Sequence, residues 1–211
     1  MPLVTVTLPS LSTLRGPWAA LAAVCAARDW GSSAHAKGPL WHFDDGGGNW
    51  ADVHLLPGGR AVLLGNDHEY SETYYGPAAE YFGEPETDLL AGAPDWWREP
   101  LPAYLAGDQW FGFVHGWDGQ RWQRAEYDLD DGLHSIGVPG VDPDDTAGLI
   151  AQFALAAPGN NGTRPPRGVV DALIAADGAV TPSQLEAVLG GPGWDVAAGV
   201  SAANAFLTEA I

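Results

Sequence analysis

WADVHLLPGGRAVLLG, residues 50–65, is the stretch that decides the fold. Two runs rich in Val, Leu and Ala, Trp50–Leu56 and Arg60–Gly65, flank the short turn Pro57-Gly58-Gly59. Strand-forming runs joined by a short glycine turn predict a β-hairpin. Apolar and polar side chains alternate along the first run, and that alternation predicts a sheet covered on one side.

A second hairpin is predicted downstream. Gln109–His115 and Gln120–Tyr127 flank the turn Gly116–Gly119, where Asp-Gly supplies residues that tolerate a positive φ. Leu133–Val138 is expected to add a further strand, and Leu3–Leu8 a short strand at the start. Several short strands joined by tight turns indicate an antiparallel sheet.

Helix signals occupy the remainder of the chain. Pro17 suits a first helical position and Gly31 a C-terminal cap, so a helix is expected between them. Between residues 77 and 106, five prolines permit only short helical turns. Further helices are predicted at Thr146–Ala157, at Val169–Ala176, at Pro182–Leu189 after a Thr181 capping box, and from the Asp195 cap to about Glu209.

The predicted fold is therefore α+β, with an antiparallel β-sheet built from hairpins, helices packed on one face and a C-terminal helical segment. Residues 1–157 are expected to form the core domain. Residues 158–167 (PGNNGTRPPR) have the composition of a linker loop. Residues 168–211 form the C-terminal segment, which is too small to bury much surface alone and is expected to pack on the core.

The charge is strongly negative, with 27 Asp and Glu against 9 Lys and Arg, a formal net charge of −18. This excludes sequence-independent nucleic-acid binding and a polybasic membrane contact, which both need clustered basic residues. Neither a signal peptide nor an apolar run long enough to span a bilayer is recognisable, so a cytoplasmic location is predicted. Abundant Ala, Gly and Pro, with Arg preferred to Lys, indicate a bacterial genome of high GC content.

The densest group of functional side chains is NDHEYSETYY, residues 66–75, directly after the second strand. It contains Asp67, His68, Glu69, Tyr70 and Glu72, and loops that follow strands often carry sites. These residue types suit a hard metal ion, but their spacing matches no established ligand frame. An exposed acidic loop in which the His serves as a hydrogen-bond partner is the preferred interpretation over a metal site, and neither a metal nor a cofactor is predicted.

Two further features bear on function. Residues 125–145 hold seven acids and neither Lys nor Arg; DLDDGLH resembles the start of a calcium loop, but the Glu that should follow is absent. The chain is also Trp-rich, with ten Trp, and Trp96-Trp97 lies among prolines and acids. Carboxylates near Trp also permit a glycosidase interpretation. The single Cys25, in an apolar run, is expected to be a buried thiol.

Aromatic anchors ringed by carboxylates are typical of a surface that captures a basic protein. Leu101-Pro102, Tyr104-Leu105 and the predicted strand Trp110–Val114 resemble the Leu-Pro and aromatic pattern of the SUKH-type immunity superfamily. The chain departs from that pattern because a complete hairpin precedes the Leu-Pro pair. The resemblance implies an acidic cytoplasmic α+β protein that neutralises a partner.

The leading hypothesis is a protein-binding module of immunity or antitoxin type, without enzymatic activity, that binds a basic partner. The predicted binding residues are Asp67, His68, Glu69, Tyr70, Glu72, Trp96 and Trp97. The alternative is a small hydrolase or metal-dependent enzyme that uses the loop Asn66–Glu72. A third interpretation is a structural subunit that dimerises through Trp96-Trp97. The sequence gives no oligomeric state.

Overall fold

The computed structural model describes residues 2–155 and 162–208. The chain divides into two compact units: unit 1 contains Met1–Leu8 and Asp45–Ile136, and unit 2 contains Pro9–Asp44 and Gly137–Ile211. The fold is α+β with antiparallel strands, as the sequence predicts. The predicted domain boundaries at residues 157 and 168 stay a prediction, and residues 158–161 of the expected linker lie outside the described residues.

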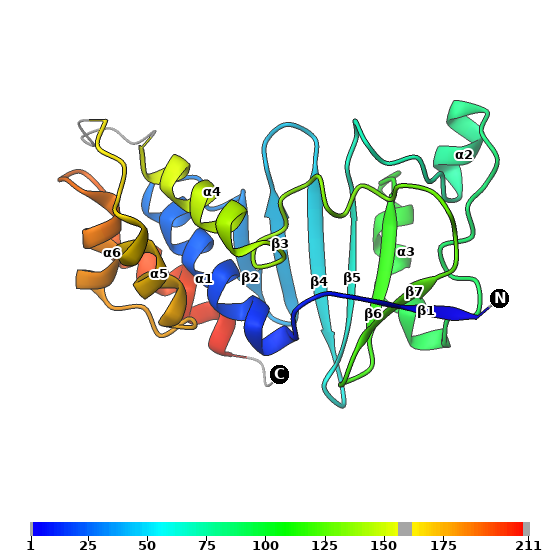
Figure 1. Ribbon diagram of the computed structural model, residues 1–211, viewed down its shortest axis with the longest axis horizontal. Helices are drawn as coiled ribbons and strands as arrows, with labels where there is room; N and C mark the ends of the chain where they lie inside the picture. The colour runs from blue at the N-terminus through cyan, green and yellow to red at the C-terminus, as the bar shows by residue number, and fades with distance from the viewer. Residues whose placement is uncertain (1, 156–161, 209–211) are drawn as a thin grey trace. The chain divides into compact units, whose positions relative to one another are not determined.

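Five antiparallel strands form the sheet of unit 1, in the order β1-β7-β6-β5-β4 (Figure 1). Their bounds are Leu3–Val6 (β1), Trp50–Leu56 (β4), Arg60–Asn66 (β5), Phe113–Trp117 (β6) and Trp122–Ala125 (β7). The hairpin β4–β5 confirms the prediction from residues 50–65, with Trp50 opposite Asn66 and Leu56 opposite Arg60. Gly58 and Gly59 both adopt a positive φ in its turn, a conformation that glycine adopts without steric cost.

The second hairpin forms, but its strands begin two to four residues later than predicted. Its turn is centred on Gly119, where Asp118 N–H donates to the Arg121 carbonyl at 3.2 Å. The strand predicted at Leu133–Val138 is wrong, because residues 133–137 form turns and Val138 has no regular structure. Gly132 and Gly137 adopt positive φ values that interrupt an extended strand.

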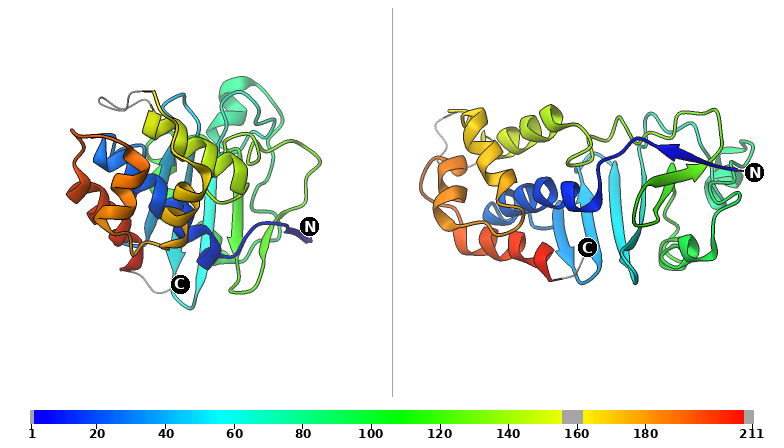
Figure 2. Two further views of the ribbon diagram at one scale, coloured as in Figure 1. Left: turned by 60° about the vertical axis from the view of Figure 1, so that its left-hand side comes forward. Right: turned by 60° about the horizontal axis from the view of Figure 1, so that its bottom comes forward.

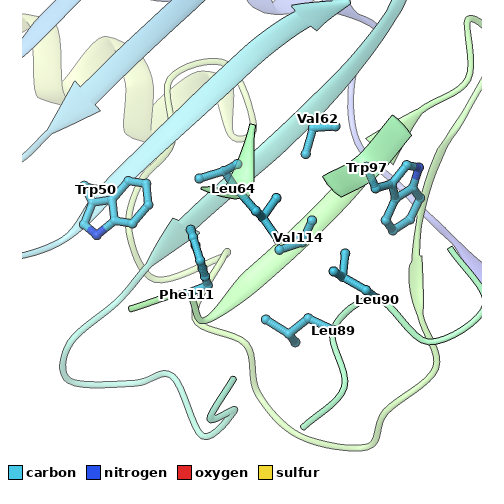
Figure 3. Packing of buried hydrophobic residues seen from close by; sticks show 9 residues of the cluster. Trp50, Val62, Leu64, Leu89, Leu90, Trp97, Phe111 and Val114 are labelled. Atoms are coloured by element: carbon cyan, nitrogen blue, oxygen red, sulfur yellow. The ribbon is translucent and has the colours of Figure 1, made fainter. Parts of the chain in front are cut away.

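Both faces of the β4–β5–β6 sheet are buried, whereas the sequence predicts one solvated face. Trp50, Val62, Leu64 and Val114 project from one face into a hydrophobic cluster, part of which is drawn in Figure 3. Residues 89–111 complete this cluster and include the helices η1 (Asp95–Arg98) and α3 (Leu101–Leu105). With α2 (Pro77–Phe82), these are the short helical turns predicted between the prolines.

Unit 2 combines a hairpin with a group of helices. The hairpin strands are β2 (Ala34–Lys37) and β3 (Leu40–Asp44), and the helices are α1 (Leu11–Ala27), α4 (Pro143–Leu155), α5 (Arg167–Ala175), α6 (Pro182–Leu189), α7 (Val196–Asn204) and η2 (Ala205–Leu207). Helix α1 contacts each of the helices α4 to α7, and Figure 2 shows it among them. In the core of unit 2, the ring centroid of Trp18 lies 6.0 Å from that of Trp41 and 6.5 Å from that of Phe43.

Helix α1 begins six residues before the predicted start at Pro17, because Ser10 is its N-cap and accepts a hydrogen bond from Thr13 N–H. Pro17 therefore lies inside the helix, at the expense of one backbone hydrogen bond. Its C-cap is Arg28 instead of the predicted Gly31, and Asp29 follows with a φ of 64°. At the other end of the chain, the Thr181–Gln184 capping box of α6 is confirmed.

Candidate functional site

The loop after β5 closes on itself through Asp67. Asp67 Oδ1 accepts hydrogen bonds from the backbone N–H groups of Glu69 (2.9 Å) and Tyr70 (3.0 Å). Asp67 N–H donates to Ser71 Oγ at 3.1 Å, and Ser71 N–H donates back to the Asp67 carbonyl at 3.2 Å. This turn satisfies the backbone locally and leaves His68, Glu69 and Tyr70 exposed.

The same loop is joined to the second acidic segment of the sequence. Glu72 N–H donates to the Asp130 carbonyl at 2.7 Å, and Ser71 Oγ donates to the Asp131 carbonyl at 2.9 Å. The approach requires glycine at 132, where φ is +80° and a Cβ would lie 2.5 Å from Ser71 Oγ. Two acidic stretches some 60 residues apart in sequence thus lie side by side.

Together these segments form what we call the acidic face, residues 68–72 and 128–130. Its exposed carboxylates come from Glu69, Glu72, Asp128 and Asp130. Tyr70, on the same loop, is 59% exposed. Four of the seven predicted binding residues, His68, Glu69, Tyr70 and Glu72, lie on this face, and a fifth, Asp67, is buried next to it in the same loop.

His68 is exposed but held by the segment before β4. Asn49 Oδ1 lies 3.0 Å from His68 N and 2.9 Å from His68 Nδ1. Because an amide oxygen only accepts hydrogen bonds, Nδ1 carries the proton in this arrangement. Asn49 is in turn fixed by Asp45, which accepts from its side-chain amide at 3.0 Å.

Trp96 and Trp97 belong to the hydrophobic cluster of Figure 3 and its border, not to the acidic face. Trp97 is 1% exposed, so it has no surface to offer a partner. A Cβ at position 116 would lie 2.1 Å from its ring, which shows how closely the indole packs on Gly116. Trp96 is half-buried, and the Arg60 guanidinium lies 5.2 Å from its ring centroid. Adjacent Trp residues thus have different roles, and Trp97 is a core residue.

A small cavity of about 150 Å³ opens beside the loop. Tyr74, Phe82 and Trp110 form its aromatic wall, with ring centroids 5.4 Å apart for Tyr74–Phe82 and 4.9 Å for Phe82–Trp110. Asp67 and Glu69 also line it. Phe82 is 50% exposed, and its neighbour Tyr81 in α2 is 73% exposed.

Asp67 is 1% exposed and is one of the residues that line this cavity. Its Oδ1 accepts the two backbone hydrogen bonds of the turn, whereas its buried Oδ2 accepts none from the described residues. A buried carboxylate oxygen without a donor is costly, because it has given up its hydration.

A second polar group lies behind the acidic face. His115, 1% exposed on β6, has its Nε2 3.1 Å from Asp131 Oδ2, and Tyr127 Oη donates to the same oxygen at 2.8 Å. Burial disfavours ionisation of Asp131, but the hydrogen bonds from His115 and Tyr127 outweigh it and lower the pKa of Asp131 to about 2. His115, Asp131 and Arg124 line a larger cavity of about 570 Å³.

A third polar group lies on the opposite face of the sheet. Tyr104 Oη donates to Asp52 Oδ2 and lies 2.6 Å from His54 Nε2. The tyrosine has one proton to give, so His54 Nε2–H is the donor to Tyr104 Oη. Burial lowers the pKa of His54, which keeps the imidazole neutral near pH 7.

Metal binding has no built site in the described part of the chain, where no three His, Cys, Asp or Glu side chains converge as a metal centre requires. The carboxylates of the DLDDGLH segment instead bind their own loop: Asp130 Oδ1 accepts from Gly132 N–H at 2.9 Å and Asp131 Oδ1 from Leu133 N–H at 3.1 Å.

Sequence reasoning missed the aromatic wall and the His115–Asp131 pair. Tyr81-Phe82 and Trp110 were each visible as aromatic residues near acids, but nothing local indicates that they meet. The sequence offers one signal for His115: it lies in a predicted strand, on the face where the alternate residues are apolar.

No protein-family model, no curated protein and no solved structure matches this chain. Across residues 2–155 and 162–208, no helix has the length and apolar character needed to traverse a bilayer.

Proposed function

We propose that this protein is a binding module that captures a basic protein through its acidic face. The observation that carries the proposal is the hydrogen-bonded pairing of the loop at 67–72 with the segment at 130–132. That pairing places the loop that carries Glu69, Tyr70 and Glu72 beside the segment that carries Asp128 and Asp130, and all five of these side chains are exposed. A charged rim around an aromatic residue attracts a cationic partner and gives it an anchor.

The distribution of charge supports this proposal. Unit 1 contains 17 Asp and Glu but only four Arg and not one Lys. Each of these arginines has a partner nearby: Arg60 lies over Trp96, Arg98 beside Asp95, Arg121 beside Asp118, and Arg124 over Tyr127. The excess negative charge of unit 1 is therefore left for an external cation.

The exposed apolar side chains support it as well. Six large hydrophobic residues are exposed among the described residues, and four of them lie in unit 1. Those four are Tyr70, Tyr81, Phe82 and Leu129. Tyr70 and Leu129 belong to the acidic face, and Phe82 lines the small cavity next to it. Aromatic and acidic groups thus coincide, as an immunity or antitoxin-type protein that neutralises a basic bacterial toxin requires.

The proposal is tested with decalysine and decaarginine peptides as basic probes, using calorimetry at about 20 mM and 200 mM NaCl. Both peptides should bind, and the affinity should fall steeply with salt. The triple variant Glu72→Gln, Asp128→Asn, Asp130→Asn should weaken binding about tenfold or more at low salt. Each substitution preserves side-chain size and removes one charge.

A matched triple variant provides the control. Asp29→Asn, Asp108→Asn and Glu186→Gln also remove three negative charges, at exposed positions that do not belong to the acidic face. If binding depends on net charge alone, both triple variants will weaken it equally, and the acidic face is then not the binding surface.

An enzyme is a second candidate, because the His115–Asp131 pair lines a cavity of about 570 Å³. An Asp that accepts from a His ring is the orienting part of a hydrolase triad. The remaining His115 Nδ1, however, has no hydrogen-bond partner among the described residues, so no Ser or Thr hydroxyl is in place as a nucleophile. Hydrolysis of p-nitrophenyl acetate that His115→Ala abolishes, and that His134→Ala leaves intact, would favour the enzyme.

A further inference from the structure

We propose that the small cavity beside the acidic face is a receptor for the ammonium group of a lysine side chain. The inference rests on the proposed function, since it names which group of the basic partner is held and where. The cavity is lined by residues of unit 1 alone, from the loop after β5, from α2 and from the segment before β6.

The wall of the cavity suits a cation. Tyr74, Phe82 and Trp110 meet at interplanar angles of 55° and 66°, so their rings form a corner and not a flat stack. The negatively polarised ring faces attract an ammonium group placed within about 6 Å of a ring centroid. The lining contains no Lys or Arg that would compete for this place.

The buried carboxylate supplies the charge. Asp67 Oδ2 is buried and accepts no hydrogen bond from the described residues, while its partner oxygen is held by two backbone donors. An entering N–H donor would satisfy Oδ2 and neutralise a carboxylate that the fold has removed from water. This orphaned acceptor, together with the aromatic corner, distinguishes the cavity from an ordinary acidic loop.

The geometry of Asp67 favours lysine over arginine. A guanidinium binds a carboxylate best through two parallel hydrogen bonds, one to each oxygen. Here Oδ1 is already occupied by the N–H groups of Glu69 and Tyr70. One free oxygen suits the compact point charge of an ammonium group.

The size of the cavity agrees with a single side chain. Pockets for small-molecule ligands have volumes of roughly 300–1,000 Å³. This cavity, at about 150 Å³, is smaller and accommodates the end of one side chain. One lysine of a partner would thus enter the cavity, while the carboxylates of the acidic face bind neighbouring basic residues of that partner.

The test uses small probes, so that binding in the cavity is measured without the wider contacts of a basic protein. Nα-acetyl-lysine methylamide is titrated into the ¹⁵N-labelled protein and followed by the backbone signals of residues 67–71 and the indole signal of Trp110. We expect saturable shifts in about the millimolar range, and at least fivefold weaker binding of the norleucine and arginine analogues.

Two variants probe the cavity, and one serves as control. Asp67→Asn preserves the oxygen that closes the turn but removes the charge, and Phe82→Leu removes one ring at a half-exposed position. Each should weaken the lysine probe about fivefold to tenfold. Glu84→Gln removes an exposed charge outside the cavity lining and should change binding less than twofold.

The two proposals fail separately. If the lysine and norleucine probes bind alike, or if Asp67→Asn has no more effect than Glu84→Gln, the cavity is not an ammonium receptor. The acidic face is then still judged by its own triple variants and the decapeptides. If the lysine probe binds as expected but the two triple variants weaken decapeptide binding equally, the ammonium receptor is supported. The proposal that the acidic face binds a basic protein is then contradicted.

Discussion

His115 Nε2 lies 3.1 Å from Asp131 Oδ2 in the buried layer directly behind the acidic face. The carboxylate also accepts from Tyr127 Oη at 2.8 Å and, through Oδ1, from Leu133 N–H at 3.1 Å. Because Ser71 Oγ donates to the Asp131 carbonyl, the same residue connects β6 to the loop that carries the acidic face. A buried network of this kind couples the stability of unit 1 to the shape of its surface.

Asp131→Asn should therefore lower stability with a characteristic pH dependence. The pKa of Asp131 is lowered to about 2 from 3.8, so the unfolded chain binds this proton more readily than the folded protein. The ionised Asp131 carboxylate therefore contributes about 2 kcal/mol to the free energy of unfolding. This contribution is complete above about pH 4 and is lost as the pH falls toward 2. Urea unfolding between pH 2 and 7 should show this acid-side decline in the wild type and a flatter profile in the variant.

Asp128→Asn is the control for that experiment, because Asp128 is exposed in the same segment. It should change the free energy of unfolding by less than about 0.5 kcal/mol at every pH. Equal pH profiles for the wild type and Asp131→Asn would show that another carboxylate carries the acid sensitivity.

Sequence patterns identified the hairpin β4–β5 because its signals are local: alternating side chains and a turn that requires glycine. The capping box of α6 is equally local. At α1 two local rules competed, and the hydrogen bond at Ser10 prevailed over the preference of Pro17 for a first helical position. The strands β2 and β3 were missed, although Trp41 and Phe43 alternate with half-buried residues on β3.

The candidate site was only partly predictable, for a physical reason. The carboxylates of residues 67–72 were recognisable as a dense polar loop after a strand. Their pairing with residues 130–132 depends on long-range hydrogen bonds and on space left by Gly132, which no local pattern encodes. The sequence likewise does not determine which of Trp96 and Trp97 is the buried core residue, because that depends on which indole faces Gly116.

Tyr104→Phe should destabilise unit 1 by about 1–3 kcal/mol. The hydroxyl donates to Asp52 and accepts from His54, so its loss leaves His54 Nε2–H without this acceptor and weakens the satisfaction of a buried carboxylate. The Tyr104 ring stacks on Trp50 with centroids 5.5 Å apart, and a phenylalanine ring retains this stacking. Equilibrium unfolding in urea measures the change.

Tyr81→Phe makes the same chemical change where the ring is 73% exposed. It should leave the free energy of unfolding within about 0.5 kcal/mol of the wild type. Similar losses in both variants would mean that the Asp52–Tyr104–His54 chain contributes no specific stability.

Cys25 should be inert toward thiol reagents while the protein is folded. Burial raises the pKa of its thiol to about 12, an effect that the nearby positive charge of Arg28 only partly offsets. Since the thiolate is the reacting species, Ellman's reagent should release no colour from the native protein at pH 8. One equivalent should react in guanidinium chloride, and rapid reaction without denaturant would show that the α1 core opens readily.

Gly116→Ala should be among the more damaging small substitutions in unit 1. Its Cβ would lie 2.1 Å from the Trp97 indole, so β6 and η1 would have to separate or the ring would have to leave its position. Overpacking of this kind costs about 1–3 kcal/mol. Gly168→Ala is the matched control, because a Cβ there meets nothing within 4 Å in helix α5. Alanine should stabilise that helix by up to about 1 kcal/mol, so the midpoint of thermal unfolding should fall for Gly116→Ala and rise for Gly168→Ala.

A Gly116→Ala protein as stable as the wild type would mean that Trp97 is free to repack, and the assignment of Trp97 to the core would be wrong.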